Sequence, residues 1–161
     1  MDNNEIHNNI EYTENLLYSI NTADAVDFSK WTKEKVILRY KEKLPSFPIY
    51  NNFIYWCNLG INVGSEQNKL RPTLILKSSK NSPICAVLPL TTKRLNDQFL
   101  FHIDLETINS TVLVEQLKVV SKLRITNPFR KKGRLITISS TDWRNINLQL
   151  ENLYRLRPLK N

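Results

Sequence analysis

The period of the hydrophobic positions changes once along the chain. Apolar side chains recur at helical spacing among polar residues in two stretches, residues 4–21 and about 27–44. The apolar positions of the first stretch are Ile6, Ile10, Leu17 and Ile20. Pro45 and Pro48 then interrupt the pattern, because proline lacks a backbone donor and disfavours helix in the residue before it. We therefore predict a helical N-terminal extension, 1–48, followed by a second domain, 49–161.

Beyond residue 48 the pattern consists of short β-branched and aromatic runs separated by turn residues. These runs span residues 53–59, 73–77, 84–90, 99–104, 112–120 and 135–138. A final helix is expected after them, with Ser139, Ser140 or Thr141 as its N-cap. Its predicted buried stripe is Trp143, Ile146, Leu150, Leu153 and Tyr154. The expected fold is α+β and mainly β: a small, strongly curved sheet or barrel with a C-terminal helix, preceded by a helical arm.

Charge is distributed unevenly over these two parts. The chain has 161 residues and a net charge of +8, yet residues 1–29 hold six acidic residues and no Lys or Arg. Residues 49–161 hold 17 of the 23 basic residues against seven acidic ones, an excess of 10. A positive field of this kind attracts polyanions such as RNA, although many basic proteins never bind nucleic acid. The acidic arm could cover the basic face, or it could be an ordinary solvated helical segment.

The remaining composition favours a cytoplasmic protein without a metal site. No signal-peptide pattern is present, and no apolar run approaches the roughly 20 residues that a membrane span needs. Cys57 and Cys85 lie in apolar β-rich segments without CxxC spacing. They are interpreted as reduced core thiols rather than as a disulfide or zinc ligands.

A polar loop with two glycines separates the first two predicted strands. It reads Gly60-Ile61-Asn62-Val63-Gly64-Ser65-Glu66-Gln67-Asn68-Lys69-Leu70-Arg71-Pro72. Glycine permits tight turns, and Pro72 fixes its own φ, so Arg71 should stand at a defined strand entrance. This arrangement suits a rigidly aimed guanidinium.

The loop and two later blocks resemble the PemK/MazF family. Its members carry a Gly-x-x-x-Gly-Ser-Glu-Gln loop followed by Arg-Pro and a strand. The second block, Val87-Leu88-Pro89-Leu90-Thr91, is similar to the family's strand that ends in a functional threonine. The third block begins at Val114-Glu115-Gln116-Leu117-Lys118 and continues to Ile125. Together the resemblance covers about residues 53–156.

The resemblance implies an SH3-like barrel of the CcdB/MazF type and an endoribonuclease toxin. Such a toxin cleaves single-stranded RNA or mRNA at short sequences, without a metal ion or other cofactor. The 2′-hydroxyl attacks the adjacent phosphate and leaves a 2′,3′-cyclic phosphate. The expected partners are the RNA substrate, a second copy in a homodimer, and a cognate antitoxin whose acidic tail covers the site.

Three residues are the catalytic candidates: two match functional residues of the family, and the third is the nearest carboxylate in the motif. Arg71 matches the family's arginine, and its planar fork can hold two phosphate oxygens. Thr91 matches the threonine, with Thr92 as the alternative after a one-residue slip. Glu66 is the candidate proton acceptor or the group that orients Arg71. The structural alternatives are an Arg71–Glu66 ion pair and an ordinary strand-end threonine.

Further positions are candidates for RNA binding. Gln67 and Gln116 either contact bases or stabilise the loop or a dimer, whereas Lys69, Lys93 and Lys118 are candidate phosphate contacts. The basic run 130–132 either contacts phosphate or is a solvated turn. Leu113 and Val119 depart from the family, in which some members carry an arginine and a threonine there. These departures place the mechanism on Arg71 and Thr91.

Three other functions remain open from the sequence. A CcdB-like toxin would poison DNA gyrase through protein binding, and a non-catalytic SH3-like module would bind nucleic acid without cleaving it. A paired-histidine ribonuclease would require His7 and His102 to meet, although His102 lies in an apolar run typical of a core-edge histidine.

Overall fold

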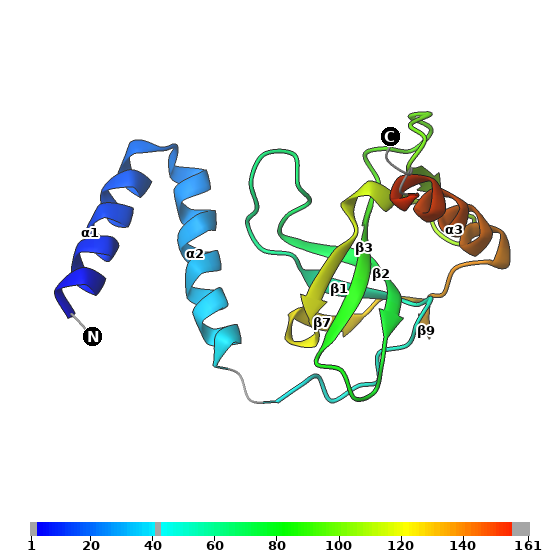
Figure 1. Cartoon of the computed structure of the whole chain (residues 1–161), viewed down its shortest axis with the longest axis horizontal. Helices are drawn as coiled ribbons and strands as arrows, with labels where there is room; N and C mark the ends of the chain where they lie inside the picture. Colours follow the sequence, from blue (N-terminus) through cyan, green and yellow to red (C-terminus); the bar gives the residue numbers. More distant parts are fainter. Residues whose placement is uncertain (1–2, 41–42, 156–161) are drawn as a thin grey trace, which may run out of the picture. The chain divides into compact units, whose positions relative to one another are not determined.

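The chain forms two compact units, residues 1–40 and 41–161 (Figure 1). The structure is a computed structural model, and it describes residues 3–40 and 43–155.

The first unit is a pair of helices, α1 (Asn3–Ser19) and α2 (Thr22–Arg39). Asn21 is the N-cap of α2, and its side-chain oxygen accepts a hydrogen bond from Asp24 N–H at 2.9 Å. This cap starts the helix before residue 27, the predicted beginning. The helix ends at Arg39 rather than at Leu44, because Tyr40 N–H turns back to the carbonyls of Ile37 and Leu38.

The apolar positions of α1 are largely exposed. All residues of α1 are described, and none of them is buried. The exposed large side chains of this helix include Ile6, Ile10, Tyr12, Leu16 and Tyr18.

In the described residues, no helix is long and apolar enough to cross a membrane. The hypothesis that this acidic arm restrains a basic site stays a prediction.

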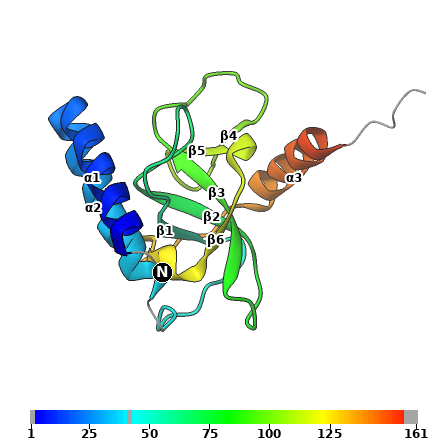
Figure 2. The same cartoon turned by 60° about the vertical axis from the view of Figure 1, so that its left-hand side comes forward.

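The second unit is built on one antiparallel, strongly curved sheet (Figure 2). Its strands are β1 (Ile54–Asn58), β2 (Leu70–Ser78), β3 (Ile84–Thr91), β4 (His102–Asp104), β5 (Thr111–Leu113), β6 (Lys118–Ser121) and β7 (Ile125–Pro128). The order is β4-β5-β3-β2-β1-β7, and β6 also pairs with β3. This arrangement confirms the predicted curved, mainly β fold. The described strands leave β4 and β7 at open edges, so they do not close the ring of a barrel.

The sheet bends where β3 changes its neighbour. Residues 84–87 of β3 pair with β6, whereas Leu90 and Thr91 pair with β5. Pro89 lies between the two segments and has no N–H to give to a ladder. Two hydrophobic clusters form on opposite faces of the sheet, because successive strand residues point to opposite sides. One cluster surrounds Leu74, Leu88 and Ile146, and the other surrounds Tyr55, Ile75 and Val87.

Several predicted strands differ from the observed ones. The run 112–120 is split by a 3₁₀ turn, η1 (Val114–Gln116), in which Leu117 N–H donates to Val114 O at 3.3 Å. The run 99–104 forms a strand only at its end, as β4. Strand β7 was not predicted, and the run 135–138 contributes only Leu135 to a short hairpin, β8 (Arg130–Lys131) and β9 (Arg134–Leu135). Alternation of apolar residues continues through such turns, so it cannot locate them.

The basic run 130–132 belongs to this hairpin and its turn. Lys132 and Gly133 have φ values of 49° and 78°, and the side chains of the run are exposed. Arg130 Nη1 donates to Gly133 O at 2.9 Å across the turn. The solvated-turn interpretation therefore describes the local structure.

The two cysteines are buried free thiols in the same hydrophobic cluster, as predicted. Burial raises the pKa of the Cys57 thiol to about 12, and the neighbouring Cys85 adds to this shift. Burial also raises the pKa of Cys85, to about 11.

Residues 47–50, which precede β1, pack against Tyr55 within the second unit. Tyr55 Oη donates to Pro48 O at 2.9 Å and accepts from Tyr50 N–H at 3.1 Å. The Phe47 ring stacks on the Tyr55 ring with centroids 6.1 Å apart. This unit thus includes residues before 49, and the division into 1–48 and 49–161 stays a prediction about which residues carry the activity.

The C-terminal helix, α3 (Ser140–Tyr154), begins at a capping box. Of the three predicted N-caps, Ser139 takes this role. Ile146 is fully buried, and Trp143, Leu150 and Leu153 pack against the same cluster. Tyr154 was wrongly assigned to the stripe: it is 54% exposed, because it lies in the last turn, beyond the core.

Asp142 connects the start of α3 to the β4–β5 loop, and its replacement is expected to destabilise the fold. Its carboxylate is 1% exposed and accepts from Ser139 N–H at 3.0 Å and Glu106 N–H at 3.1 Å. Asp142→Ala leaves both donors without a partner, so we expect a loss of about 2–4 kcal/mol in the free energy of unfolding. Urea denaturation measures this change. The exposed neighbour Thr141→Ala is the control, expected within about 0.5 kcal/mol of the parent, and an equally small loss for Asp142→Ala would contradict the assignment.

Candidate active site

The strand register places Arg71 and Thr91 at the same end of the β2–β3 pair. In the β2–β3 pair, Thr73 lies opposite Pro89 and Leu74 opposite Leu88. Arg71 lies two residues before Thr73 on β2, and Thr91 lies two residues after Pro89 on β3. Both residues therefore stand just beyond this ladder, at the same end of the antiparallel pair. The first two sequence blocks therefore meet at one end of β2 and β3.

Arg71 is oriented by the backbone of its own loop. It is partly buried, and its Nε–H donates to Asn68 O at 2.7 Å. On the opposite strand it pairs in register with Cys57, which is fully buried. A guanidinium has five N–H donors. Among the described residues only the Nε–H of Arg71 is bonded, so the donors on its two Nη atoms remain available to a ligand.

Thr91 is the last residue of β3 and is nearly buried. Its Oγ1 accepts from Lys93 N–H at 3.2 Å, a short turn that ends the strand. The accepting role leaves the hydroxyl proton available for donation. Thr92 is exposed at the start of the following loop. Of the two candidate threonines, Thr91 is thus the one held in a fixed position.

The glycine loop, residues 59–69, is closed at its base by backbone bonds. Leu59 N–H donates to Lys69 O at 2.9 Å, and Lys69 N–H donates to Gly60 O at 2.5 Å. Lys69 adopts φ 63°, which lets the chain turn into β2. Within the loop, Asn62 Nδ2 donates to Gln67 O at 2.7 Å. The loop therefore delivers Arg71 from an ordered base.

Two polar contacts join this loop to the third sequence block. Glu66 pairs with Lys118, with Oε2 and Nζ 2.8 Å apart, and Gln67 N–H donates to Gln116 Oε1 at 3.2 Å. The described partner of Glu66 is therefore Lys118, not Arg71, so the structural Arg71–Glu66 ion pair is not formed. All three blocks come together, and Lys118 and Gln116 act at least as anchors of the loop.

Leu113 and Val119, the two positions that depart from the family, have uncharged side chains. Leu113 is buried in β5, and Val119 is exposed on β6. Lys93 is exposed two residues after Thr91. The catalytic and RNA-binding roles of the named residues stay predictions.

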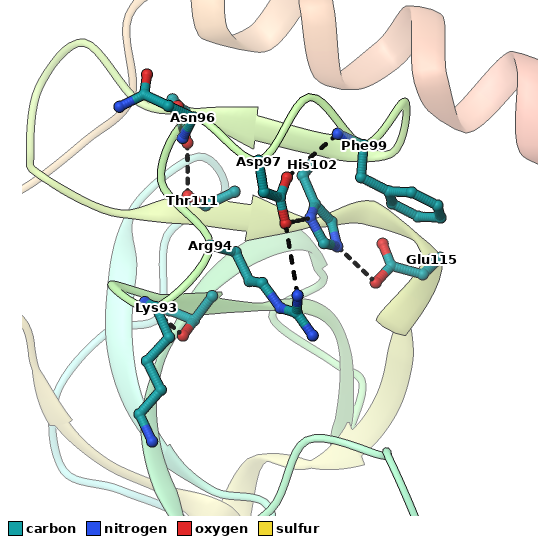
Figure 3. A network of polar contacts seen from close by, with 10 residues as sticks. Lys93, Arg94, Asn96, Asp97, Phe99, His102, Thr111 and Glu115 are labelled. Atoms are coloured by element: carbon teal, nitrogen blue, oxygen red, sulfur yellow. Dashed lines mark hydrogen bonds and ion pairs between the residues drawn. The ribbon is translucent and has the colours of Figure 1, made fainter.

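A polar network beside these blocks was not predicted from the sequence (Figure 3). His102 Nδ1 lies 2.7 Å from Asp97 Oδ2, and its Nε2 lies 3.2 Å from Glu115 Oε1. Each ring nitrogen of His102 thus faces one carboxylate. The His102 side chain is only 10% exposed, which confirms the core-edge position expected for it. The one sequence signal was a titratable residue between apolar ones.

Asp97 is the charged end of this network. Desolvation opposes its ionisation, but the Phe99 N–H, the His102 ring and the Arg94 guanidinium together hold the pKa of its carboxyl below the ordinary value. Arg94 Nη1 stands 3.9 Å from Asp97 Oδ2. Asp97 therefore stays an acceptor at neutral pH and fixes the His102 ring.

The family model of PemK-like, MazF-like toxins of type II toxin–antitoxin systems matches residues 52–154 of the chain. The chain belongs to this family. The matched residues contain all three sequence blocks, which confirms the family predicted from them. The toxin family domain therefore carries both the strand ends and the loop described above.

Individual relatives agree with this assignment. Endoribonuclease EndoA from Bacillus subtilis is 26% identical, over 46% of this chain and 72% of that protein. The fold is similar to that of MazF from Deinococcus radiodurans, with a TM-score of 0.55 and 16% identity, covering 71% of this chain and 100% of the other. The MazE–MazF structure from the same organism gives a TM-score of 0.51 and 16% identity, with 72% and 100% covered. These structural matches show the shared fold.

Proposed function

We propose that this PemK/MazF-family chain is a sequence-selective endoribonuclease that cleaves single-stranded RNA, including mRNA, without a metal ion. The observation that carries the proposal is that Arg71 and Thr91 lie at the same end of the antiparallel pair of β2 and β3. The family match and the endoribonuclease relative support it. In the proposed reaction the 2′-oxygen forms a bond to the adjacent phosphorus while the bond to the 5′-oxygen breaks. The 5′-oxygen takes a proton from water, leaving a 2′,3′-cyclic phosphate and a 5′-hydroxyl.

Arg71 stabilises the charge that builds on the phosphoryl oxygens. The bond from its Nε–H to Asn68 O fixes the plane of the guanidinium before substrate binds. A donor that is already oriented needs no reorganisation during the reaction, which is why such groups lower the barrier. Arginine hardly ever releases its proton, so its role is charge stabilisation rather than acid catalysis.

Thr91 donates a hydrogen bond to the same phosphate. Its Oγ1 accepts from the Lys93 N–H, and this contact aims the hydroxyl. Glu66 is the candidate acceptor for the 2′-hydroxyl proton. Its carboxylate is 53% exposed and is held at the edge of the loop by Lys118.

The surrounding charges suit a polyanion. Lys69 and Lys93 lie next to the two catalytic candidates, and residues 49–161 carry an excess of 10 positive charges. Each phosphate neutralised on a single strand releases counterions and strengthens binding at low salt. Gln67 and Gln116 lie at the junction of loop and η1, where RNA bases would pass.

The proposed partners follow from the family. The MazE–MazF structure is a complex of another organism's proteins. For this chain we propose a cognate antitoxin in a type II system, with an acidic tail that covers the basic site, a homodimeric toxin and action in the cytoplasm.

Cleavage in the presence of a chelator tests the mechanism. The purified protein, incubated with single-stranded RNA in excess EDTA, is expected to release fragments with 2′,3′-cyclic phosphate and 5′-hydroxyl ends. The reason is that Arg71 supplies the positive charge that a metal would otherwise provide. Mass spectrometry of the fragments identifies both ends.

An identically purified Arg71→Ala protein excludes a contaminating nuclease as the source of cleavage. Activity that disappears with EDTA and returns with magnesium would overturn the metal-independent mechanism. Intact RNA combined with inhibition of DNA gyrase would instead support the CcdB-like alternative.

A further inference from the structure

A pocket of about 460 Å³ lies beside the proposed active site. It is lined by Gln67 of the glycine loop, by Arg94 and Phe99 of the β3–β4 loop, and by His102, Glu115 and Gln116. Gln67 and Gln116, which join the glycine loop to η1, both line this pocket, and Arg94 follows Thr91 by three residues in the chain. Its volume lies within the range of about 300–1,000 Å³ typical of small-molecule sites.

Two acceptor oxygens of this pocket are buried and lack a partner among the described residues. They are Gln67 Oε1 and Glu115 Oε2. Buried polar atoms in proteins nearly always have a partner, so two orphaned acceptors in one pocket point to a ligand that brings hydrogen-bond donors.

The network in Figure 3 holds one of these acceptors in place. Glu115 Oε1 contacts His102 Nε2 at 3.2 Å, and His102 Nδ1 is in turn fixed by Asp97 at 2.7 Å. Gln67 is fixed through its backbone, whose N–H donates to Gln116 Oε1. Asp97 and His102 thus act as positioning residues, and the free oxygens are acceptors of defined location.

An aromatic ring and a cation complete the lining. Phe99 is 51% exposed, and its ring centroid lies 4.8 Å from that of His102. Exposed aromatic rings of this kind stack on nucleobases. The Arg94 side chain is 63% exposed, and it can donate to a carbonyl oxygen of a bound base.

The base with matching donors is guanine. Its Watson–Crick edge presents two adjacent donors, N1–H and N2–H₂, beside the O6 acceptor. Adenine and cytosine each present an amino donor beside an acceptor nitrogen, and uracil presents one donor between two acceptors. Only guanine offers donors to both free acceptors while leaving O6 for Arg94.

We propose that this pocket binds a guanine base of the RNA, with Glu115 as the residue that reads it. The proposal rests on the proposed endoribonuclease function and specifies part of its sequence preference. Glu115 Oε2 and Gln67 Oε1 accept from the guanine edge, Arg94 donates to O6, and Phe99 stacks on the ring. Glu115 and Gln67 set specificity and take no part in bond cleavage.

Binding of RNA that cannot be cleaved tests this proposal separately from catalysis. The probes are fluorescent 2′-O-methyl heptamers of adenosine, with guanosine, inosine or adenosine at the centre. Inosine lacks the 2-amino group but keeps N1–H and O6. We expect the full-length protein to bind the heptamer with a central guanosine at least about tenfold more tightly than the all-adenosine heptamer. The affinity for the heptamer with a central inosine should lie between these two.

Glu115→Gln is expected to abolish this preference, so that the three heptamers bind within about twofold of one another. Glu151→Gln, an exposed position on α3, is the matched control and should keep the parent's preference. His102→Asn should weaken the preference without changing affinity for the adenosine heptamer, as expected of a positioning residue.

Equal affinities of the parent protein for all three heptamers would overturn the proposal, whatever the variants do. An unchanged guanine preference in Glu115→Gln would overturn the role of Glu115. Failure to cleave ordinary RNA, with the guanine preference intact, would instead refute the endoribonuclease function and leave the pocket assigned. The two failures are thus distinguishable.

Discussion

Arg71→Lys should lower kcat/KM for RNA cleavage by about 10² or more. The substitution keeps the positive charge but removes the planar fork and the Nε–H that bonds to Asn68 O. A single preorganised donor to a transition-state oxyanion contributes about this much to catalysis. Initial rates on a labelled single-stranded RNA, over a range of enzyme concentrations, measure the loss.

The controls for Arg71 separate catalysis from folding. Arg144→Lys, at an exposed position of α3, should leave both the rate and the melting temperature unchanged. Arg71→Ala should be at least as inactive as Arg71→Lys and still fold. Near-parental cleavage by folded Arg71→Ala would show that the active site lies elsewhere.

Thr91→Val is the second large expected loss, about 10-fold to 10²-fold in kcat. Valine has nearly the same shape as threonine but removes the hydroxyl, and with it the donor to the phosphate. It also removes the acceptor for Lys93 N–H, so the end of β3 loses one contact. Single-turnover cleavage measures the chemical step without product release.

Thr92→Val tests which of the two adjacent threonines functions. Thr92 is exposed, and its replacement should change the rate by less than about twofold. Thr91→Ser, which restores the hydroxyl, should recover much of the activity. The reverse pattern, with Thr92→Val damaged and Thr91→Val active, would move the functional threonine by one residue.

The sequence predicted best those strands that are buried on both faces. β1, β2 and β3 contain long apolar runs, and Ile54, Leu74 and Leu88 are fully buried in the observed sheet. The C-terminal helix was equally clear, because Ile146 lies at helical spacing from Trp143 and Leu150. These signals are local, and local periodicity is sufficient to find them.

The features that the sequence did not predict depend on contacts between distant residues. Gln67 and Gln116, which join the glycine loop to η1, are 49 residues apart in the chain. Glu66 and Lys118 are 52 residues apart, so a local periodic pattern likewise cannot predict their ion pair. Residues 125–128 become a strand because β1 offers them an edge, not because their own pattern is strong.

The candidate site was only partly accessible for the same reason. Arg71 and Thr91 were found by resemblance, and their position at the same end of β2 and β3 became apparent only from the strand register. The polar network escaped prediction because His102 of β4 meets Asp97 of the β3–β4 loop and Glu115 of the 3₁₀ turn η1. No spacing rule for carboxylates and histidine applies to such an arrangement.

The two buried cysteines make the chain a convenient host for site-specific labelling. Only the thiolate reacts with maleimides or alkylating agents, and with thiol pKa values of about 12 and about 11 the thiolate is scarce at neutral pH. Fewer than about one in 10³ of either thiol is ionised there, and both are also shielded by the surrounding side chains. A single cysteine introduced on the surface would therefore carry a dye without prior removal of Cys57 or Cys85. The native pair would react only when the core opens, which turns it into an internal reporter of unfolding.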